Sequence, residues 1–207
     1  MSRSLRSLRS PAKRHTVSLC LLDSTRLYKQ LARSRLAQIV RMADLLIAAL
    51  KAGRKVIWFG NGGSATQSQH MAAELVGRFA VDRRALPSIS LTENMASVTA
   101  IGNDYGYEAL FARQLEALAQ AGDVAVGLST SGSSPNVLAG LKKARELGLT
   151  AIGLTGGSGG QMNKGVCDLC IVVPSSVTAR IQEAHLTIGH IVCGLIEEHE
   201  TARAPAR

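Results

Sequence analysis

The sequence predicts an α/β fold in which helices cover both faces of a doubly wound, five-stranded parallel sheet. Short apolar segments alternate with longer segments of helical periodicity, and two of the apolar segments run directly into loops of small residues. The hydrophobic content of 46% includes only 3% aromatic residues. A core of Ala, Val, Leu and Ile is therefore expected, as suits helices packed on a parallel sheet. A chain of 207 residues is long enough for one domain with a sizeable core.

We expect residues 1–22 to form a basic, disordered extension, residues 23–202 to form a single domain and residues 203–207 to form a tail. Residues 1–16 carry five of the 24 Lys and Arg residues and no acidic residue, a composition typical of disorder. Without those five basic residues, the net charge of +9 falls to +4. Such a mildly basic domain suits a phosphorylated metabolite, and no nucleic-acid partner is expected.

The apolar runs and the cysteines indicate a cytoplasmic protein without a membrane partner. The chain has no run of about 18 apolar residues, the length that a membrane-spanning helix needs. Cys167 and Cys170 have C-x-x-C spacing, but they lead into an apolar strand rather than a helix N-terminus that would activate a redox pair. We therefore expect the cysteines to be buried, reduced thiols.

In chain order, the first predicted element is one long amphipathic helix over residues 24–52, capped by Asp23 or Ser24 and ended by Gly53. Its broad apolar face suggests contact with another subunit. Strands are predicted over residues 56–59, 87–91, 123–128, 150–154 and 169–173. Further helices are predicted between the first loop and Gly77 and over residues 94–101, 108–120, 135–147 and 178–200, with a turn over residues 102–106.

The first loop, Gly60-Asn61-Gly62-Gly63-Ser64, lies between an apolar strand and a helix. Glycines let the backbone approach a ligand closely, and the free N–H groups of a helix's first turn favour a phosphate. Ser64 suits the position of the helix cap, where its hydroxyl could contact the same phosphate. Such loops are also common in α/β proteins without a phosphate site.

The second loop, Ser129-Thr130-Ser131-Gly132-Ser133-Ser134-Pro135, repeats this arrangement with hydroxyl donors. It follows a clean strand and precedes a helix that begins with proline. Serine-rich loops are often only solvated turns, but this placement favours a site for phosphate oxygens. Because the carboxyl ends of parallel strands share one edge of the sheet, both loops are expected at that edge.

Two helices carry further candidate residues. His70 and Glu74 are four positions apart and therefore lie on one helix face beside the first loop. Gln182 and His190 are eight positions apart on the last helix, so they also point to broadly the same side. A solvated His–Glu pair, and a histidine satisfied in the core or at an interface, are the simpler interpretations of these patterns.

Four consecutive blocks of the sequence resemble bacterial phosphoheptose isomerases, which belong to the sugar-isomerase (SIS) domain class with its flavodoxin-like three-layer sandwich. The resemblance covers about residues 24–200, and the blocks occur in the family's order. They are GNGGSATQSQHMAAELVGRF, ALPSISLTENMASVTAIGNDYGYE, GDVAVGLSTSGSSPNVLAGLKKARELG and TARIQEAHLTIGHIVCGLIE.

This resemblance implies a cytoplasmic homotetramer that interconverts D-sedoheptulose 7-phosphate and D-glycero-D-manno-heptose 7-phosphate, the first step towards heptose for lipopolysaccharide core or other surface glycans. It implies one zinc ion per subunit, held by His70, Glu74, Gln182 and His190. It also implies a substrate and phosphate site formed by Asn61, Gly62, Gly63, Ser64, Arg78, Asn94, Ser129, Thr130, Ser131, Ser134 and Gln182.

The implied reaction moves a proton between two carbons through an enediol, so it needs a base near the carbon and an acid near the carbonyl oxygen. The resemblance assigns the base to Glu74 and the acid to His190. Zinc would polarise the carbonyl group. One nitrogen of His190 cannot coordinate zinc and donate a proton in the same state.

The sequence departs from the family pattern at two places. Asn94 stands where many members have Asp, and Val177 and Ala179 stand where members have an Asp just before the R-I-Q-E block. An alternative function is a non-catalytic SIS module that binds the replication initiator DnaA or senses sugar phosphates. Relatives that bind the initiator lack the helix carboxylate and the late histidine, both of which are present here as Glu74 and His190.

Overall fold

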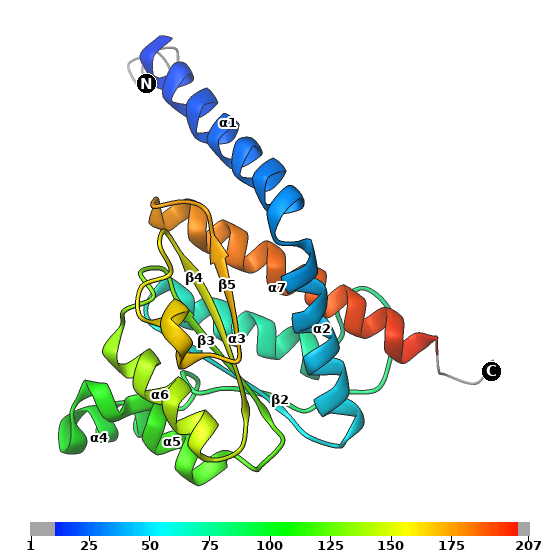
Figure 1. The fold of residues 1–207 in the computed structure, drawn as a ribbon, viewed down its shortest axis with the longest axis vertical. Coiled ribbons are helices and arrows are strands. Elements are labelled where there is room, and N and C mark those ends of the chain that lie inside the picture. The colour runs from blue at the N-terminus through cyan, green and yellow to red at the C-terminus, as the bar shows by residue number, and fades with distance from the viewer. Residues whose placement is uncertain (1–10, 203–207) are drawn as a thin grey trace, which may run out of the picture.

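The structure, a computed structural model, describes residues 11–202. Its five strands form one fully parallel sheet in the order β2-β1-β3-β4-β5 (Figure 1). Each strand lies within two residues of its predicted position, so the predicted sheet is confirmed. The strands are β1 Val56–Gly60, β2 Ser88–Ser90, β3 Val124–Ser129, β4 Thr150–Gly156 and β5 Leu169–Val173.

Helices cover both faces of this sheet, as predicted. On β1, Val56 and Trp58 face the core beneath α2, α3 and α7, whereas Ile57 and Phe59 face the core beneath α5 and α6. The helices are α1 Pro11–Ser34, α2 Leu36–Lys51, α3 Gly63–Val76, α4 Met95–Tyr105, α5 Leu110–Leu118, α6 Pro135–Glu146 and α7 Thr178–Thr201, with short turns η2 Tyr107–Ala109 and η3 Met162–Val166. Among the described residues, no helix combines the length and apolar character needed to cross a membrane.

The predicted single helix over residues 24–52 is wrong, because the structure has two helices there. α1 begins at Pro11, and the backbone leaves helical geometry at Arg35, with φ −127° and ψ 1°. The Arg35 guanidinium donates to the carbonyl of Val172 on β5 at 2.9 Å, which ties this break to the sheet edge. α2 then packs along the sheet.

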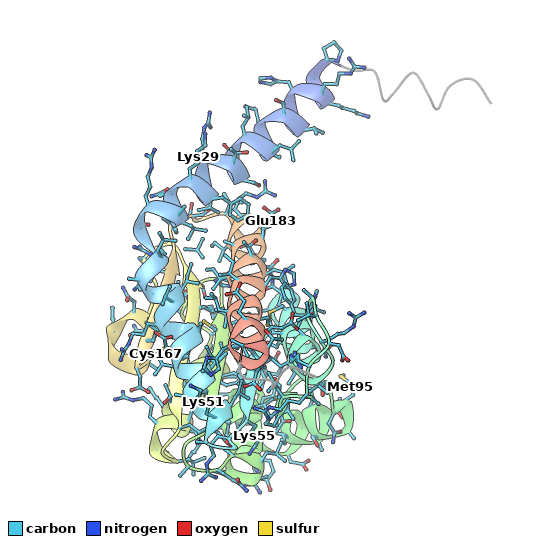
Figure 2. The ribbon with its side chains drawn as sticks, turned by 90° about the vertical axis from the view of Figure 1, so that its right-hand side faces the viewer. Lys29, Lys51, Lys55, Met95, Cys167 and Glu183 are labelled. Atoms are coloured by element: carbon cyan, nitrogen blue, oxygen red, sulfur yellow. The ribbon has the colours of Figure 1, made fainter. Side chains whose placement is uncertain are left out.

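Residues 11–22 are helical, so the predicted disorder is also wrong for this part of the extension. Proline suits the first turn of a helix, and no glycine or further proline interrupts the chain before Arg35. This part of α1 extends beyond the N-terminal end of α7, near which Glu183 is labelled (Figures 1 and 2). Its side chains Val17, Leu21 and Leu22 are exposed. Residues 1–10 and 203–207 lie outside the described part of the chain.

Two other local predictions need correction. α4 continues through residues 102–105, which were expected to form a turn, and ends only at Gly106, whose φ of 84° favours glycine. The cysteines are all free, but only Cys193 is buried, while Cys167 and Cys170 are half-buried and Cys20 is exposed.

Close packing of α7 on α3 positions the residues discussed below. A Cβ atom at Gly189 of α7 would overlap the Met71 sulfur of α3, so a larger residue would require the Met71 side chain to move. His190, the next residue, thereby lies beside His70 of α3, with ring centroids 5.1 Å apart.

We expect Gly189→Ala to lower the free energy of unfolding by about 1–3 kcal/mol, the usual cost of overpacking. Gly194→Ala on the same helix is the matched control, because its nearest neighbour would be Phe79 Cε1 at an ordinary 3.6 Å. The control should keep or gain stability, since alanine favours helix. Urea unfolding of both variants measures the difference, and equal stability of the two would contradict the packing constraint.

Candidate functional site

The two predicted loops lie next to each other at the carboxyl edge of the sheet. β1 and β3 are neighbours, with Gly60 opposite Leu128, and the loops follow these two strands. The order of the strands reverses between β1 and β3, and ligands of open α/β sheets bind at such a switch point. The predicted location of both loops is therefore confirmed.

The first loop turns into α3 through a pair of glycines. Gly62 has a φ of 55°, and a Cβ atom on Gly63 would lie 2.5 Å from Gln182 Nε2, so both positions favour glycine. The prediction that Ser64 caps this helix is wrong. α3 begins at Gly63, and the buried Ser64 lies inside its first turn and donates its own N–H to the carbonyl of Asn61 at 2.9 Å.

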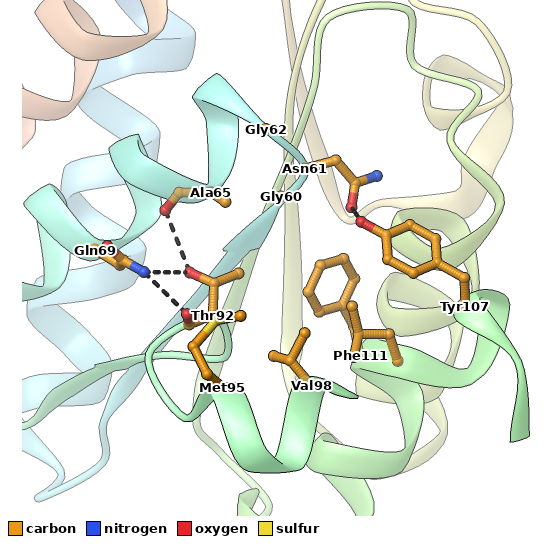
Figure 3. A pocket seen from close by; sticks show the side chains of 11 residues that line it. Gly60, Asn61, Gly62, Ala65, Gln69, Thr92, Met95, Val98, Tyr107 and Phe111 are labelled. Carbon is orange, nitrogen blue, oxygen red and sulfur yellow. Dashed lines mark hydrogen bonds between the residues drawn. The ribbon is translucent and has the colours of Figure 1, made fainter. Parts of the chain in front are cut away.

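A pair of asparagines joins the two loops. Asn61 Nδ2 donates to Asn136 Oδ1 at 2.8 Å, and Asn136 Nδ2 donates back to Asn61 Oδ1 at 2.9 Å. Tyr107 also donates its hydroxyl to Asn61 Oδ1 at 2.9 Å (Figure 3). Asn136 and Tyr107 were not predicted as site residues. The position of Asn136 just after Pro135 at a helix start was the available signal.

The second loop brings three serine hydroxyls together. Ser129 Oγ lies 2.9 Å from Ser134 Oγ and 3.4 Å from Ser131 Oγ. The loop is held from behind, because the carbonyl of Thr130 accepts a hydrogen bond from the Gly156 N–H at 3.2 Å. Converging hydroxyls of this kind can donate to a phosphate, and the phosphate role of this loop stays a prediction.

His70, Glu74 and His190 form a cluster at the surface between α3 and α7. His70 Nε2 lies 2.8 Å from Glu74 Oε1 and 3.3 Å from His190 Nε2. One potential ligand atom from each residue lies within 4.8 Å of the others. Two imidazole nitrogens and a carboxylate oxygen are a donor set typical of catalytic zinc, so the cluster fits such an ion.

Gln182, the fourth predicted ligand, lies two turns before His190 on α7. Its amide adjoins Gly63, and its backbone carbonyl accepts a hydrogen bond from Gln67 Nε2 at 2.6 Å. Gln182 therefore lies between the first loop and the His–Glu cluster along the seam of α3 and α7.

A pocket of about 190 Å³ opens beside the first loop (Figure 3). In its wall, Gln69 Nε2 donates to the carbonyl of Thr92 at 2.9 Å, which joins α3 to the end of β2. Of the predicted site residues, Asn61 and Gly62 line it, and the His–Glu cluster is not part of its lining. Its other lining residues include Met95 and Val98 of α4, Tyr107 and Phe111.

Comparison with known proteins assigns the family. The SIS domain model matches residues 22–156. A phosphoheptose isomerase from Burkholderia pseudomallei is 54% identical over 162 residues, or 78% of this chain and 82% of the relative. One from Aquifex aeolicus is 55% identical over 161 residues, or 78% of this chain and 84% of the relative. The chain belongs to the phosphoheptose isomerase family of SIS domain proteins.

A solved structure supports the same assignment. A phosphoheptose isomerase from Neisseria gonorrhoeae aligns with a TM-score of 0.84 and 37% identity, covering 89% of this chain and 98% of that one. The flavodoxin-like strand order described above is thus the SIS domain fold of this family.

Arg78 and Asn94, which the family resemblance predicts to contact the substrate, lie on two separate segments. Arg78 is exposed in the segment after α3, next to Phe79, whose ring centroid lies 5.5 Å from that of His190. Asn94 is exposed and caps α4 by accepting the Ser97 N–H at 3.1 Å. This cap suits an asparagine, which is a good capping residue, as is the aspartate that the family resemblance led us to expect here.

The second departure from the family pattern lies at the start of α7. Val177 occupies the cap position without a side-chain hydrogen bond and is exposed, and Ala179 follows in the first turn. An aspartate here would place a negative charge at a helix N-terminus, where it is stabilising. This chain lacks that charge.

His185 is a buried histidine one turn after Gln182. Its Nε2 lies 3.2 Å from the carbonyl of Thr155, and burial lowers its pKa to about 4, although this hydrogen bond opposes the shift. The imidazole is therefore neutral at pH 7 and serves as a donor to the end of β4.

We expect Asn136→Ala to lower the free energy of unfolding by about 1–3 kcal/mol, because it removes both bonds to Asn61 and the acceptor of the buried Val137 N–H. Asn103→Ala is the control, since Asn103 is exposed and bonds only to its neighbour Asp104. Urea unfolding measures both. A cost no greater than that of the control would show that the asparagine pair does not join the loops.

A second prediction concerns pH. The unfolded chain protonates His185 near pH 6.5, whereas the folded chain does so only near 4, so stability falls as the pH drops through this window. Between about pH 7.5 and pH 5 this loss is about 2 kcal/mol. His185→Gln keeps a donor for Thr155 and should reduce the loss by about that amount, whereas the exposed control His15→Gln should not. Urea unfolding at both pH values tests this, and an unchanged pH dependence in His185→Gln would contradict it.

Proposed function

We propose that this chain interconverts D-sedoheptulose 7-phosphate and D-glycero-D-manno-heptose 7-phosphate by proton transfer between C1 and C2 of the sugar. The observation that carries the proposal is the cluster of Glu74, His70 and His190, which joins a carboxylate and two imidazoles near the two loops. It occurs in a chain that is 54–55% identical to phosphoheptose isomerases.

Glu74 is the proposed base and His190 the proposed acid. A carboxylate can take the proton from one sugar carbon, while an imidazolium can donate to the carbonyl oxygen, which yields the enediol. Glu74 Oε1 is already within hydrogen-bond distance of His70, so His70 orients the base. The Phe79 ring packs beside the His190 ring, with their centroids 5.5 Å apart.

The second loop is the proposed phosphate site. Ser129, Ser131 and Ser134 supply hydroxyl donors that need no rearrangement of the backbone. The first loop contributes less through its helix turn than predicted, because Ser64 and Ala65 already donate their N–H groups to the carbonyls of Asn61 and Gly62. Its role is to present Asn61 and the flexible glycines to the sugar.

The remaining predicted residues complete this proposed site. Gln182 lies between the loops and the cluster, where its amide can contact the sugar chain. Arg78 supplies a positive charge on the segment that follows α3. Asn94, which caps the start of α4 after β2, is proposed as a further contact to the sugar.

One zinc ion per subunit is the proposed cofactor, with His70, Glu74, Gln182 and His190 as its ligands. His70, Glu74 and His190 already bring three possible ligand atoms within 4.8 Å of one another, and a zinc site needs ligands that converge in this way. Zinc held by these residues would polarise a carbonyl group and stabilise negative charge that develops on its oxygen. Because His190 turns its Nε2 towards His70, this nitrogen is either a ligand or the proton donor in any one state.

The proposed assembly is a homotetramer in the cytoplasm that supplies heptose for lipopolysaccharide core or other surface glycans. Exposed apolar residues on the first two helices, including Leu21, Leu36 and Val40, support burial against further subunits. The four free cysteines suit a reducing compartment.

The non-catalytic alternative is less well supported. A module that only binds a partner or senses sugar phosphates has no need of a carboxylate beside two imidazoles, and the relatives named above are phosphoheptose isomerases. The isomerase reaction therefore explains more of the site.

We expect Glu74→Gln to reduce kcat for sedoheptulose 7-phosphate by about 10²–10⁴-fold, the usual contribution of a positioned base. Glu146→Gln is the matched control, because Glu146 lies on α6 and forms only a surface ion pair with Lys143. Product formation from purified protein measures both. Full activity of Glu74→Gln would refute its role as the base, whereas an inactive wild-type enzyme would refute the proposed reaction.

A further inference from the structure

A buried ion pair lies behind the candidate site and takes no part in the roles described so far. Arg83 follows α3 in the chain, Glu197 lies near the end of α7, and their side chains are only 3% and 4% exposed. Arg83 Nε lies 3.6 Å from Glu197 Oε2. Burying two charges is costly unless hydrogen bonds satisfy them, so the partners of each group indicate what the pair does.

Arg83 binds the C-terminal end of α3. Its guanidinium donates to the carbonyl of Glu74 at 2.7 Å, to that of Leu75 at 2.8 Å and to that of Gly77 at 3.0 Å. The last carbonyls of a helix have no partner within the helix, and a cation there also complements the helix dipole. Arg83 therefore caps the C-terminus of α3 and binds the backbone carbonyl of Glu74, the proposed base.

Glu197 binds the segment that follows α3. Its Oε2 accepts the Phe79 N–H at 3.0 Å, and its Oε1 accepts the N–H groups of Ala80 and Val81, both at 2.8 Å. Burial alone would raise the pKa of Glu197, but these bonds and Arg83 lower it below its ordinary value, so the carboxylate stays charged. The anchored Phe79 packs its ring on His190.

We propose that Arg83 and Glu197 are positioning residues that hold the base Glu74 and the acid His190 in their working geometry. Arg83 holds the backbone of Glu74, and Glu197 holds Phe79 against His190. The catalytic consequence rests on the proposed function, whereas the geometric consequence at His190 does not.

Glu197→Gln tests the proposal most directly. An amide has one acceptor oxygen and would turn an N–H₂ group towards a backbone N–H, so at least one bond to residues 79–81 is lost. Glu200→Gln is the matched control. Glu200 lies on the same helix and pairs with Arg84, the residue after Arg83, at 2.6 Å, but Arg84 is 55% exposed and Glu200 13% exposed.

In Glu197→Gln we expect kcat to fall about 10–100-fold, since small misplacements of catalytic groups have effects of this size. KM should change less than kcat, because the proposed phosphate site, the second loop after β3, makes no bond to Glu197 or residues 79–81. The Cε1–H signal of His190 in a proton–carbon NMR spectrum should also shift, because the ring current of Phe79 changes. Glu200→Gln should match the wild type in all three measurements.

An unchanged kcat and an unchanged His190 signal in Glu197→Gln would overturn the proposal, as would equal losses in Glu200→Gln. If Glu197→Gln does not fold, Phe79→Leu replaces it, because it removes the ring and leaves the backbone bonds. It should produce the same signal shift and a loss of kcat, and a wild-type signal and kcat would overturn the proposal. If the wild type has no isomerase activity, the proposed function fails, while the NMR comparison still tests the positioning of His190.

Discussion

The candidate site depends on the parallel packing of α7 along α3 and the segment that follows it. Gln182 meets Gly63, Gly189 meets Met71, and Glu197 meets residues 79–81, so contacts advance together along both segments. Small residues favour this approach, because a Cβ atom at Gly63 would overlap the Gln182 side chain and one at Gly189 would overlap the Met71 side chain. The pairing of His70 with His190 is a consequence of this register, since neither histidine lies in a loop that could adjust.

The packing also places the groups suited to anion binding and those suited to proton transfer on different elements. Groups suited to binding an anion lie on the loops after β1 and β3. There the hydroxyls of Ser129 and Ser134 bond to each other, and Asn61 of the first loop bonds to Asn136. Groups suited to proton transfer lie on rigid helices beside those loops. In the proposed function, the phosphate of the substrate would bind at the loops and its carbonyl group would lie at the helices, with Gln182 between them. The neutral His185 and the charged Glu197 hold the surrounding backbone without adding a second acid or base to the site.

Much of the fold and part of the candidate site could be predicted from short-range sequence patterns. The strands, the two loops and the spacing of His70 and Glu74 follow from short-range patterns, because alternation of apolar segments and helix periodicity are read within a few residues. Features set by tertiary contacts were missed. The break at Arg35 depends on a carbonyl of β5, the partner of Asn61 lies 75 residues away at Asn136, and Arg83 meets Glu197 only in the folded chain. The grouping of His190 with the α3 residues came from family resemblance, since helix spacing alone could not relate two separate helices.

Isomerisation of sedoheptulose 7-phosphate by metal-free protein, measured before and after addition of zinc with bound zinc counted per subunit, tests the central claim most directly. The account predicts that turnover depends on zinc and saturates at one ion per subunit, because His70, Glu74 and His190 offer one convergent donor set. Zinc-independent turnover would contradict the proposed role of the ion. An intact fold that binds zinc but gives no turnover would contradict the reaction itself.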